Sequence, residues 1–270
     1  MIIGNTTLDN KVVFNITKIG QRHILKNKPC EDSSCTYIDE YMAIACVADG
    51  HGDERCARAK KGSELACLKA KDSIVQFVQS HPNIVLKDTK EIDKVLVQLK
   101  SYILQSWLRA VDEDIKEHPL QENEKLVVGT TRDVYIVYGT TLLAACVTKN
   151  FWFALQIGDG DIVVKHKKQK YVMEPDDACF ANTTSSMCDT NALYSFRHYY
   201  SRKIPTSIFL TTDGFKNSFK GDTYFFATLE KVEEDIRESG TDKARESVGS
   251  FLETLTEKGS GDDISIGFIG

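Results

Sequence analysis

The chain has 270 residues, of which 41% are hydrophobic and 27% are charged, and its formal net charge is -5. These values are typical of a globular domain with a substantial core, and the slight acidic excess argues against a general nucleic-acid-binding protein. No apolar run approaches the roughly 18 residues of a membrane span, and the N-terminus lacks a signal-peptide pattern. We therefore expect one domain over residues 1–270, located in the cytoplasm.

The first part of the chain is predicted to form two strands and a helix. Alternating apolar residues predict a strand over 12–19, and an unbroken apolar run predicts a buried strand over 42–48. Residues 54–80 have apolar positions on one side of a helix, which His81-Pro82 ends.

A second, longer helix has the clearest periodicity in the sequence. Its apolar residues recur at three- and four-residue steps from Ile92 to Ile115, which is the spacing of one helix face. Asp88 and Glu91 at its start resemble a capping box, and Pro119 follows its end. We interpret this stripe as core packing.

The second half of the chain alternates between strands and amphipathic helices. Helices are predicted over 222–238 and 241–257, separated by Gly240. The strands are predicted over 141–147, 151–157, 161–165, 207–212 and 264–269. Long helices grouped between strand-rich stretches indicate an α+β fold with two stacked antiparallel sheets and helices on the outer faces.

Residues 176–200 interrupt this regularity with a long polar segment. A segment of this length in a compact domain is either a functional flap or disordered. We interpret it as a flap and regard Arg197 and His198 within it as surface residues.

Eight cysteines raise the question of disulfides or zinc. None forms a C-x-x-C pair, so the sequence gives no support for a structural zinc site. Several lie in apolar runs, where cysteine acts as a small hydrophobic residue. We expect all eight to be reduced.

One pattern recurs at five places: an apolar strand has a carboxylate at one end and a glycine or a second carboxylate beside it. If those strand ends meet, they gather oxygen ligands that suit Mg²⁺ or Mn²⁺. Without a cation, such carboxylates would repel one another and raise their own pKa values. The five places are Glu31-Asp32, Asp49-Gly50, Gly158-Asp159, Asp213-Gly214 and Asp262-Asp263.

Taken in order, these motifs resemble the signature of the metal-dependent protein phosphatases of the 2C type (the PP2C or PPM family). Each motif is weak alone, but their order and context are specific, and they extend over nearly the whole chain. The matching residues are Glu31-Asp32, Asp49-Gly50-His51-Gly52, Gly139-Thr140-Thr141, Gly158-Asp159, Thr212-Asp213-Gly214 and Asp262-Asp263-Ile264-Ser265.

The resemblance implies a four-layer α-β-β-α sandwich that hydrolyses phosphoserine and phosphothreonine in proteins with two Mg²⁺ or Mn²⁺ ions. It implies that Asp49 bridges the two ions and that the carbonyl of Gly50 contacts one of them. Asp213 and Asp262 would complete the protein ligands of the other ion.

The remaining roles also follow from the resemblance. Glu31 and Asp32 would act mostly through metal-bound waters, and Asp159 with Asp213 matches a third, weaker metal site. A hydroxide that bridges the ions would attack phosphorus, and His51 would give a proton to the departing serine or threonine oxygen.

Two positions depart from the family pattern. Asp53 stands where a second glycine usually follows the D-G-H-G run, and Asn27 stands where an arginine usually binds the substrate phosphate. Lysine and histidine lack the bidentate fork of arginine, so weaker phosphate binding would follow. The neighbouring residues that could supply positive charge are Arg22, His23, Lys26 and Lys28.

Two alternatives to protein phosphatase activity remain open. The departures at Asn27 and Asp53 would suit an inactive pseudophosphatase that binds partners as an adaptor. A phosphatase of small phosphoesters would keep the metal chemistry and change only the substrate. The leading hypothesis predicts a monomer whose partner is a phosphorylated protein, without nucleic acid or membrane.

Overall fold

The computed structural model describes residues 8, 11–81, 84, 87–125, 128–129, 133–173 and 184–270. In this part of the chain, two antiparallel sheets of five strands each form the centre of the molecule. Sheet I has the spatial order β1 (Val13–Lys18), β10 (Ile264–Ile269), β9 (Ser207–Thr211), β6 (Asp161–Lys165) and β7 (Gln169–Tyr171). Sheet II has the spatial order β2 (Ser33–Ile38), β3 (Met42–Ala48), β4 (Leu142–Thr148), β5 (Trp152–Ile157) and β8 (Arg197–Ser201).

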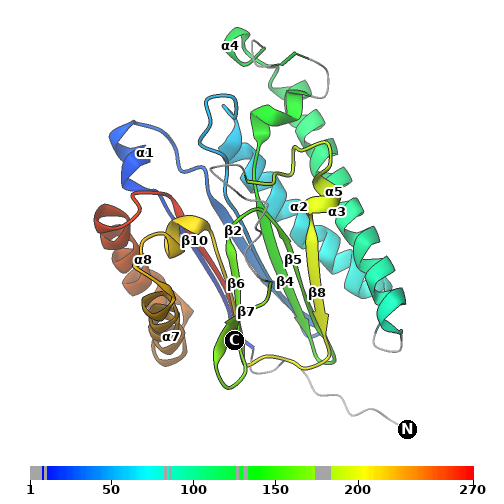
Figure 1. The fold of residues 1–270 in the computed structure, drawn as a ribbon, viewed down its shortest axis with the longest axis vertical. Helices are drawn as coiled ribbons and strands as arrows, with labels where there is room; N and C mark the ends of the chain where they lie inside the picture. Colours follow the sequence, from blue (N-terminus) through cyan, green and yellow to red (C-terminus); the bar gives the residue numbers. More distant parts are fainter. Residues whose placement is uncertain are drawn as a thin grey trace.

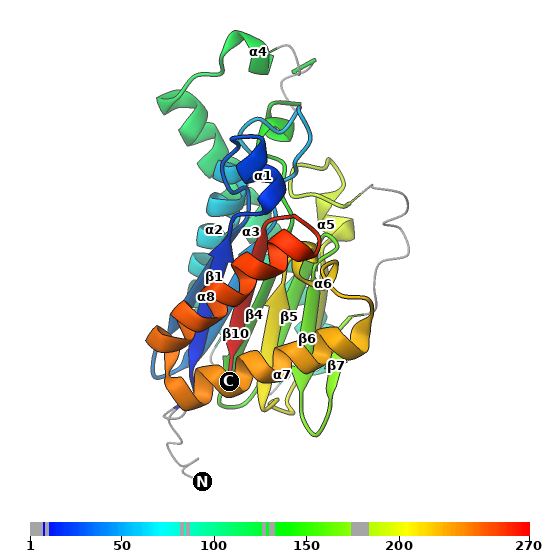
Figure 2. The ribbon, with the colours of Figure 1, turned by 90° about the vertical axis from the view of Figure 1, so that its left-hand side faces the viewer.

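Helices cover the outer face of each sheet, as the sequence predicts. The long helices α2 (Ala59–Ser80) and α3 (Thr89–Glu117) lie on sheet II (Figure 1). Figure 2 shows α7 (Asp222–Ser239) and α8 (Thr241–Lys258) lying across sheet I. The predicted α+β sandwich is therefore confirmed.

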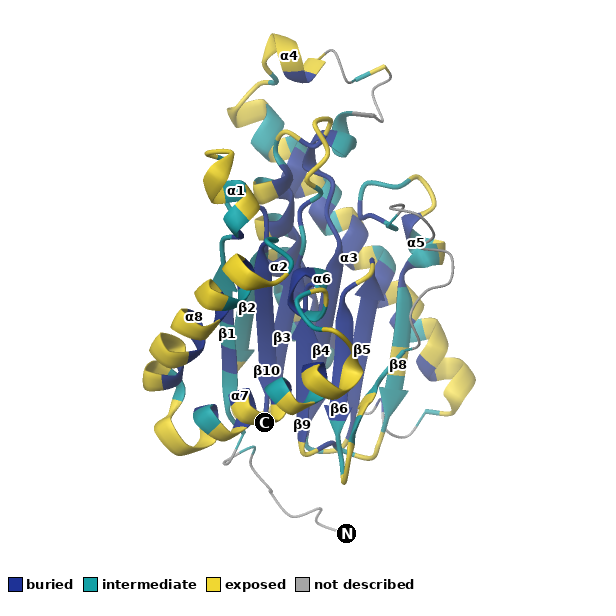
Figure 3. Ribbon diagram, turned by 60° about the vertical axis from the view of Figure 1, so that its left-hand side comes forward, coloured by how far each residue is buried: buried dark blue, intermediate teal, exposed yellow. Residues whose placement is uncertain are grey.

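Strand β3 is buried on both faces, which explains why its sequence is an unbroken apolar run. Alternate residues of a strand point to opposite faces, and both faces of β3 are covered. Ile44 and Cys46 pack on the side of α2, whereas Ala45 and Val47 pack between the sheets. All seven residues of β3 are buried, as the dark blue central strands of Figure 3 show.

Helix α3 begins and packs as its sequence predicts. The side chain of Asp88 accepts a hydrogen bond from the backbone N–H of Glu91 at 2.9 Å, which caps the first turn. The periodic stripe is buried against α2, and Trp107 Nε1 donates to the carbonyl oxygen of Gly62 at 3.0 Å. The indole N–H is therefore satisfied inside the core.

The described segments also contain five short helices. They are α1 (Gln21–Leu25), α4 (Glu122–Lys125), η2 (Asp133–Tyr138), α5 (Ala192–Ser195) and α6 (Asp213–Lys216). Figures 1 and 2 show α4 projecting beyond one end of the sheets.

Two predicted segments differ from the structure. The first long helix begins at Ala59 and not at residue 54, because Asp53 holds a turn by accepting from the backbone N–H of Arg55. The predicted flap over 176–200 is wrong for residues 197–200, which belong to the edge strand β8 (Arg197–Ser201) paired with β5. His198 there lies 3.3 Å from Asp93. Residues 176–183 lie outside the described residues.

The seven cysteines in the described segments are all free, and Cys179 lies outside them. Among the described helices, none is both long enough and apolar enough to cross a membrane.

Candidate functional site

The carboxylates of the recurring pattern lie at the same end of both sheets. Asp49 follows β3, and Asp32 precedes β2, whose first residue Ser33 pairs with Ala48. In sheet I, Thr211 at the end of β9 pairs with Asp161 and with Ile266 near the start of β10. These registers place five segments at one end of the sheets, the end remote from the C-terminus (Figure 1). Two of them precede β2 and β10, and three follow β3, β5 and β9.

The side chains gathered there line a cleft with a volume of about 520 Å³. Eight of the predicted site residues line it: His23, Glu31, Asp49, Gly50, His51, Asp159, Asp213 and Asp262. Asp32 lies behind the cleft, where it is buried. Arg22, Lys26 and Lys28 are not among the lining residues.

Two threonines hold the backbone of Asp49 in place. The N–H of Asp49 donates to Thr141 Oγ1 at 2.9 Å, and its carbonyl accepts from the N–H of Thr141 at 2.8 Å. Thr140 Oγ1 donates to the same carbonyl at 2.9 Å. This gives Gly139-Thr140-Thr141 a structural role in the motif set, because its two threonines hold the end of β3 that carries the Asp49 carboxylate.

Gly50 is required by the close approach of the neighbouring backbone. Its N–H donates to the carbonyl of Glu31 at 3.2 Å, and a Cβ at this position would lie only 2.6 Å from that oxygen. A side chain here would push the Glu31 segment away from Asp49.

Asp49 and Asp213 show the electrostatic cost of gathering carboxylates. Burial, followed by the charges of Asp32 and Asp213, raises the pKa of Asp49 well above its usual range. Burial and the charge of Asp159 raise the pKa of Asp213 to about 6, against the effect of a hydrogen bond with Asp49. Among the described residues, no lysine or arginine is a main cause acting on either pKa.

Glu31 and Asp32 have buried oxygen atoms without a hydrogen-bond partner, and Glu31 Oε2 lies 3.6 Å from His23 Nε2. Asp32 Oδ2 accepts from Thr212 Oγ1 at 2.7 Å, but Asp32 Oδ1 and Glu31 Oε2 have no hydrogen-bond donor in the described structure. Burial is the main cause that raises the pKa of both carboxyls. A buried carboxylate oxygen without a partner is costly, so both are suited to a cation or to its bound waters.

The donor set therefore fits divalent cations. In the described part of the chain, no group of three or more His, Cys, Asp or Glu side chains is arranged to hold a metal ion by itself. Protein-bound Mg²⁺ usually keeps several waters and takes one or two carboxylates. The carboxylates of Asp49 and Asp213 could supply the one or two protein ligands. The oxygens of Glu31 and Asp32 that lack a hydrogen-bond donor could accept hydrogen bonds from the waters.

Asp263 has a role that the motif comparison did not identify. Its carboxylate is buried and accepts hydrogen bonds from the backbone N–H groups of Gly20 and Glu31, both at 2.6 Å. It also forms a hydrogen bond of 2.9 Å with His23 Nδ1. It thereby ties the segment before β2 to the segment before β10. No spacing in the sequence could reveal this, because the partners are more than 230 residues apart.

Of the four residues expected to supply positive charge, three face carboxylates and one is exposed to solvent. His23 is engaged by Asp263, and Lys28 Nζ lies 3.9 Å from Glu31 Oε1. Arg22 is 64% exposed and lies 3.6 Å from Asp262 Oδ2, and Lys26 is exposed. Asn27 follows α1 in the left-handed backbone region, with φ of 53°.

His51 lies in the cleft on the loop after β3. Its N–H donates to the carbonyl of Gly139 at 3.0 Å, so the backbone of the loop is fixed. Burial lowers the pKa of His51, while Asp159, Asp189 and Asp53 oppose that change. The imidazole is therefore placed to exchange a proton beside the carboxylates.

One wall of the cleft comes from residues 184–189, which lie in the segment interpreted as a flap, although the sequence did not single out their side chains. Thr184 Oγ1 donates to Asp159 Oδ2 at 2.5 Å, and Ser186 Oγ donates to the carbonyl of Thr140 at 3.1 Å. Asp189 accepts from the N–H of Ser186 at 2.8 Å, which shapes this wall.

Gly214 controls how closely Asp213 approaches the segment of Asp262. A Cβ at Gly214 would lie 2.1 Å from the carbonyl oxygen of Asp263 and 3.1 Å from Asp262 Cβ. We expect Gly214→Ala to lower the free energy of unfolding by about 1–3 kcal/mol, measured by urea denaturation, because α6 must shift. Gly52→Ala is the control, since its nearest atom would lie at 3.7 Å, and it should change stability by less than about 0.5 kcal/mol. Equal stability of the two variants would contradict this account.

Known proteins resemble the chain in sequence and in fold. The profile of the family described as Protein phosphatase 2C matches residues 19–253. Among solved structures, PppA, described as a key regulatory component of T6SS in Pseudomonas aeruginosa, has a TM-score of 0.60 at 15% identity, covering 98% of this chain and 99% of that chain. Stp1 from Staphylococcus aureus, a serine/threonine phosphatase, has a TM-score of 0.58 at 13% identity, covering 100% and 97%.

The catalytic domain of the serine/threonine protein phosphatase PstP, in complex with two manganese ions, has a TM-score of 0.55 at 14% identity, covering 96% of this chain and 97% of that chain. At these identities, the structural likeness establishes a shared fold. No curated protein sequence matches the chain.

Proposed function

The chain belongs to the protein phosphatase 2C family, and we propose that residues 1–270 act as one domain that hydrolyses phosphoserine and phosphothreonine in proteins with bound Mg²⁺ or Mn²⁺. The observation that carries this proposal is the meeting of Asp49, Asp213 and Asp262 in one cleft with His51. We further propose that the protein acts in the cytoplasm as a monomer.

In this proposal, Asp49 and the carbonyl of Gly50 bind the cations together with Asp213 and Asp262. Bound divalent ions would neutralise phosphoryl charge and lower the pKa of water to near neutrality. The raised pKa values of Asp49 and Asp213 support this assignment, because a cation would relieve the repulsion that raises them.

Three other carboxylates are assigned supporting roles. Glu31 and Asp32 would accept hydrogen bonds from metal-bound waters through their unpaired oxygens. Asp159, which is exposed and close enough to Asp213 to raise its pKa, would contribute to a third, weaker site.

His51 would protonate the leaving group. Hydrolysis breaks the bond between phosphorus and the serine or threonine oxygen, and that oxygen needs a proton as it leaves. The backbone of His51 is held by Gly139, and Asp159 and Asp189 favour its protonated form.

We expect the purified protein to hydrolyse a phosphothreonine peptide in Mn²⁺ or Mg²⁺ and to lose that activity in a chelator. His51→Gln should lower kcat by about 10²- to 10⁴-fold, the usual contribution of a positioned general acid. Calorimetric titration with Mn²⁺ is the second readout. Absence of both turnover and millimolar metal binding would favour an adaptor, whereas a preference for small phosphoesters would change the substrate class.

A further inference from the structure

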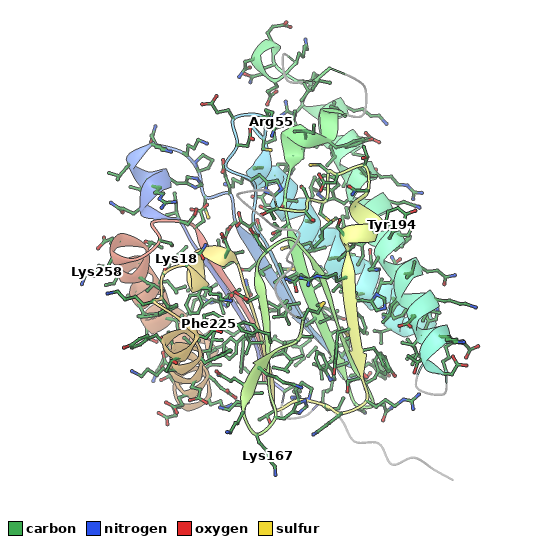
Figure 4. All side chains as sticks on the ribbon, in the orientation of Figure 1. Lys18, Arg55, Lys167, Tyr194, Phe225 and Lys258 are labelled. Atoms are coloured by element: carbon green, nitrogen blue, oxygen red, sulfur yellow. The ribbon has the colours of Figure 1, made fainter. Side chains whose placement is uncertain are left out.

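The charge of the cleft is unusual for a site that must receive a phosphate dianion. Eight carboxylates line it, and Arg55 is the one arginine or lysine side chain among its described lining residues. Figure 4 shows Arg55 on the loop before α2, at the end of the molecule where the cleft lies. The carboxylates are Glu31, Asp49, Asp53, Asp159, Asp189, Asp213, Asp262 and Asp263.

Asp53 orients the Arg55 side chain through several hydrogen bonds. Arg55 Nε donates to Asp53 Oδ1 at 3.1 Å, and Nη2 donates to Oδ2 at 2.8 Å. The N–H of Arg55 also donates to Oδ1 at 2.8 Å, so the carboxylate fixes both the backbone and the side chain. These bonds lower the pKa of Asp53 to about 2, and the pair therefore stays ionised at neutral pH.

This arrangement leaves one edge of the guanidinium available. Arginine has five N–H donors in a fixed plane, and the contacts with Asp53 use those of Nε and one of Nη2. The donors of Nη1 and the second donor of Nη2 have no partner in the described structure, and the side chain is 63% exposed. Two parallel N–H groups on such an edge match two oxygens of a phosphate.

We propose that Arg55, oriented by Asp53, binds the phosphoryl group of the substrate at the mouth of the cleft. This inference rests on the proposed phosphatase function and names the residue that recognises the dianion. It also gives Asp53 a purpose: the acid beside the D-G-H-G run holds the guanidinium in place and offsets part of its charge.

The other nearby cations are less suited to this role. His23 is bonded to Asp263, and Lys28 faces Glu31. Arg22 lies against Asp262 and does not line the cleft. Among the described lysine, arginine and histidine residues near the cleft, Arg55 alone combines a position in the lining with a free bidentate edge.

The test compares Arg55→Ala, Arg55→Lys and the wild-type protein in Mn²⁺ with a phosphothreonine peptide as substrate. Arg55→Ala should raise KM and the inhibition constant of inorganic phosphate by about 10- to 100-fold, with kcat changed by only a few-fold. Arg55→Lys should restore part of the affinity, because it keeps the charge but loses the fork. Arg109→Ala, an exposed arginine on α3 outside the cleft lining, is the matched control and should leave both constants unchanged.

The outcomes separate this inference from the proposed function. An active wild-type protein whose Arg55→Ala variant keeps its KM and its phosphate inhibition constant would overturn the role of Arg55 alone. If the wild-type protein has no metal-dependent turnover, the proposed function fails. Calorimetry with inorganic phosphate and Mn²⁺ then decides the inference, because equal affinities of wild type and Arg55→Ala would refute it.

Discussion

Replacing Asp49 by Asn is expected to remove nearly all metal-dependent turnover and, in the absence of metal, to stabilise the fold. The proposed function predicts a loss of about 10³-fold in kcat/KM, which corresponds to about 4 kcal/mol of transition-state stabilisation. The same substitution removes a carboxyl that the fold buries beside Asp32 and Asp213. The free energy of unfolding without metal should therefore rise by an amount on the order of 1 kcal/mol.

The gain in stability should depend on pH with a definite sign. The pKa of Asp49 is raised in the folded protein, so the folded state holds a proton more tightly than the unfolded state. The wild-type protein then loses stability as the pH rises from the unfolded value of about 4 towards the folded pKa, and Asp49→Asn does not. The advantage of the variant should grow over that range.

Urea denaturation with and without Mn²⁺ measures both effects. Addition of Mn²⁺ should stabilise the wild-type protein more than Asp49→Asn, because ligands that bind only the folded state shift unfolding by mass action. Glu246→Gln, an exposed change on α8, is the control for losing one negative charge. If Asp49→Asn is destabilised without metal, the carboxylates are not in electrostatic conflict and the argument for a cation site weakens.

The sequence predicts the strand ends well because the relevant signals are local. An apolar run of seven residues gives the bounds of β3, which the structure confirms. The structure adds that the backbone of Glu31 approaches Gly50 closely. The stripe of α3 and the capping role of Asp88 are confirmed for the same reason. Hydrophobic periodicity and turn residues are sufficient for such elements.

Features that depend on distant partners could not be predicted in this way. The bonds of Asp263 connect residues far apart in the chain, and the edge strand β8 has a polar sequence without alternation. The motif comparison identified Asp53 only as a departure from the glycine of the family pattern, whereas the structure pairs its carboxylate with Arg55 two residues away. A sequence gives the residue types at a site more readily than their pairing, which is decided by side-chain geometry.

A second large effect is expected at Arg58, which joins the start of α2 to the end of α3 and to α4. Its Nε and Nη2 donate to the two carboxylate oxygens of Glu124, each at 2.8 Å, and its Nη1 donates to Tyr138 Oη and to the carbonyl of His118, each at 2.7 Å. The side chains of Arg58 and Glu124 are only 14% and 9% exposed. Removing one partner of such a pair leaves the other charge buried, which costs about 3–5 kcal/mol.

Arg58→Ala should therefore lower the midpoint of urea denaturation strongly, and Glu124→Gln should lower it less because an amide can still accept a hydrogen bond. The hydrogen bond from Arg58 lowers the pKa of Glu124 in the folded state. The stability that this carboxylate contributes is complete above its unfolded pKa of about 4.3 and is lost as the pH falls through its folded pKa. The difference between wild type and Glu124→Gln should consequently be largest near pH 7 and shrink below about pH 4.

Replacing Arg58 should also reduce activity, because its side chain supports a loop that lines the cleft. Arg58 follows the loop that carries His51 and Arg55, and its side chain donates to Tyr138 Oη, beside Gly139, whose carbonyl accepts from the N–H of His51. We expect kcat/KM of Arg58→Ala to fall at temperatures where the variant remains folded, because a displaced loop misplaces groups that must meet the substrate. Arg109→Ala controls for the loss of an arginine. If Arg58→Ala unfolds earlier yet keeps full activity while folded, the network stabilises the fold without positioning the loop.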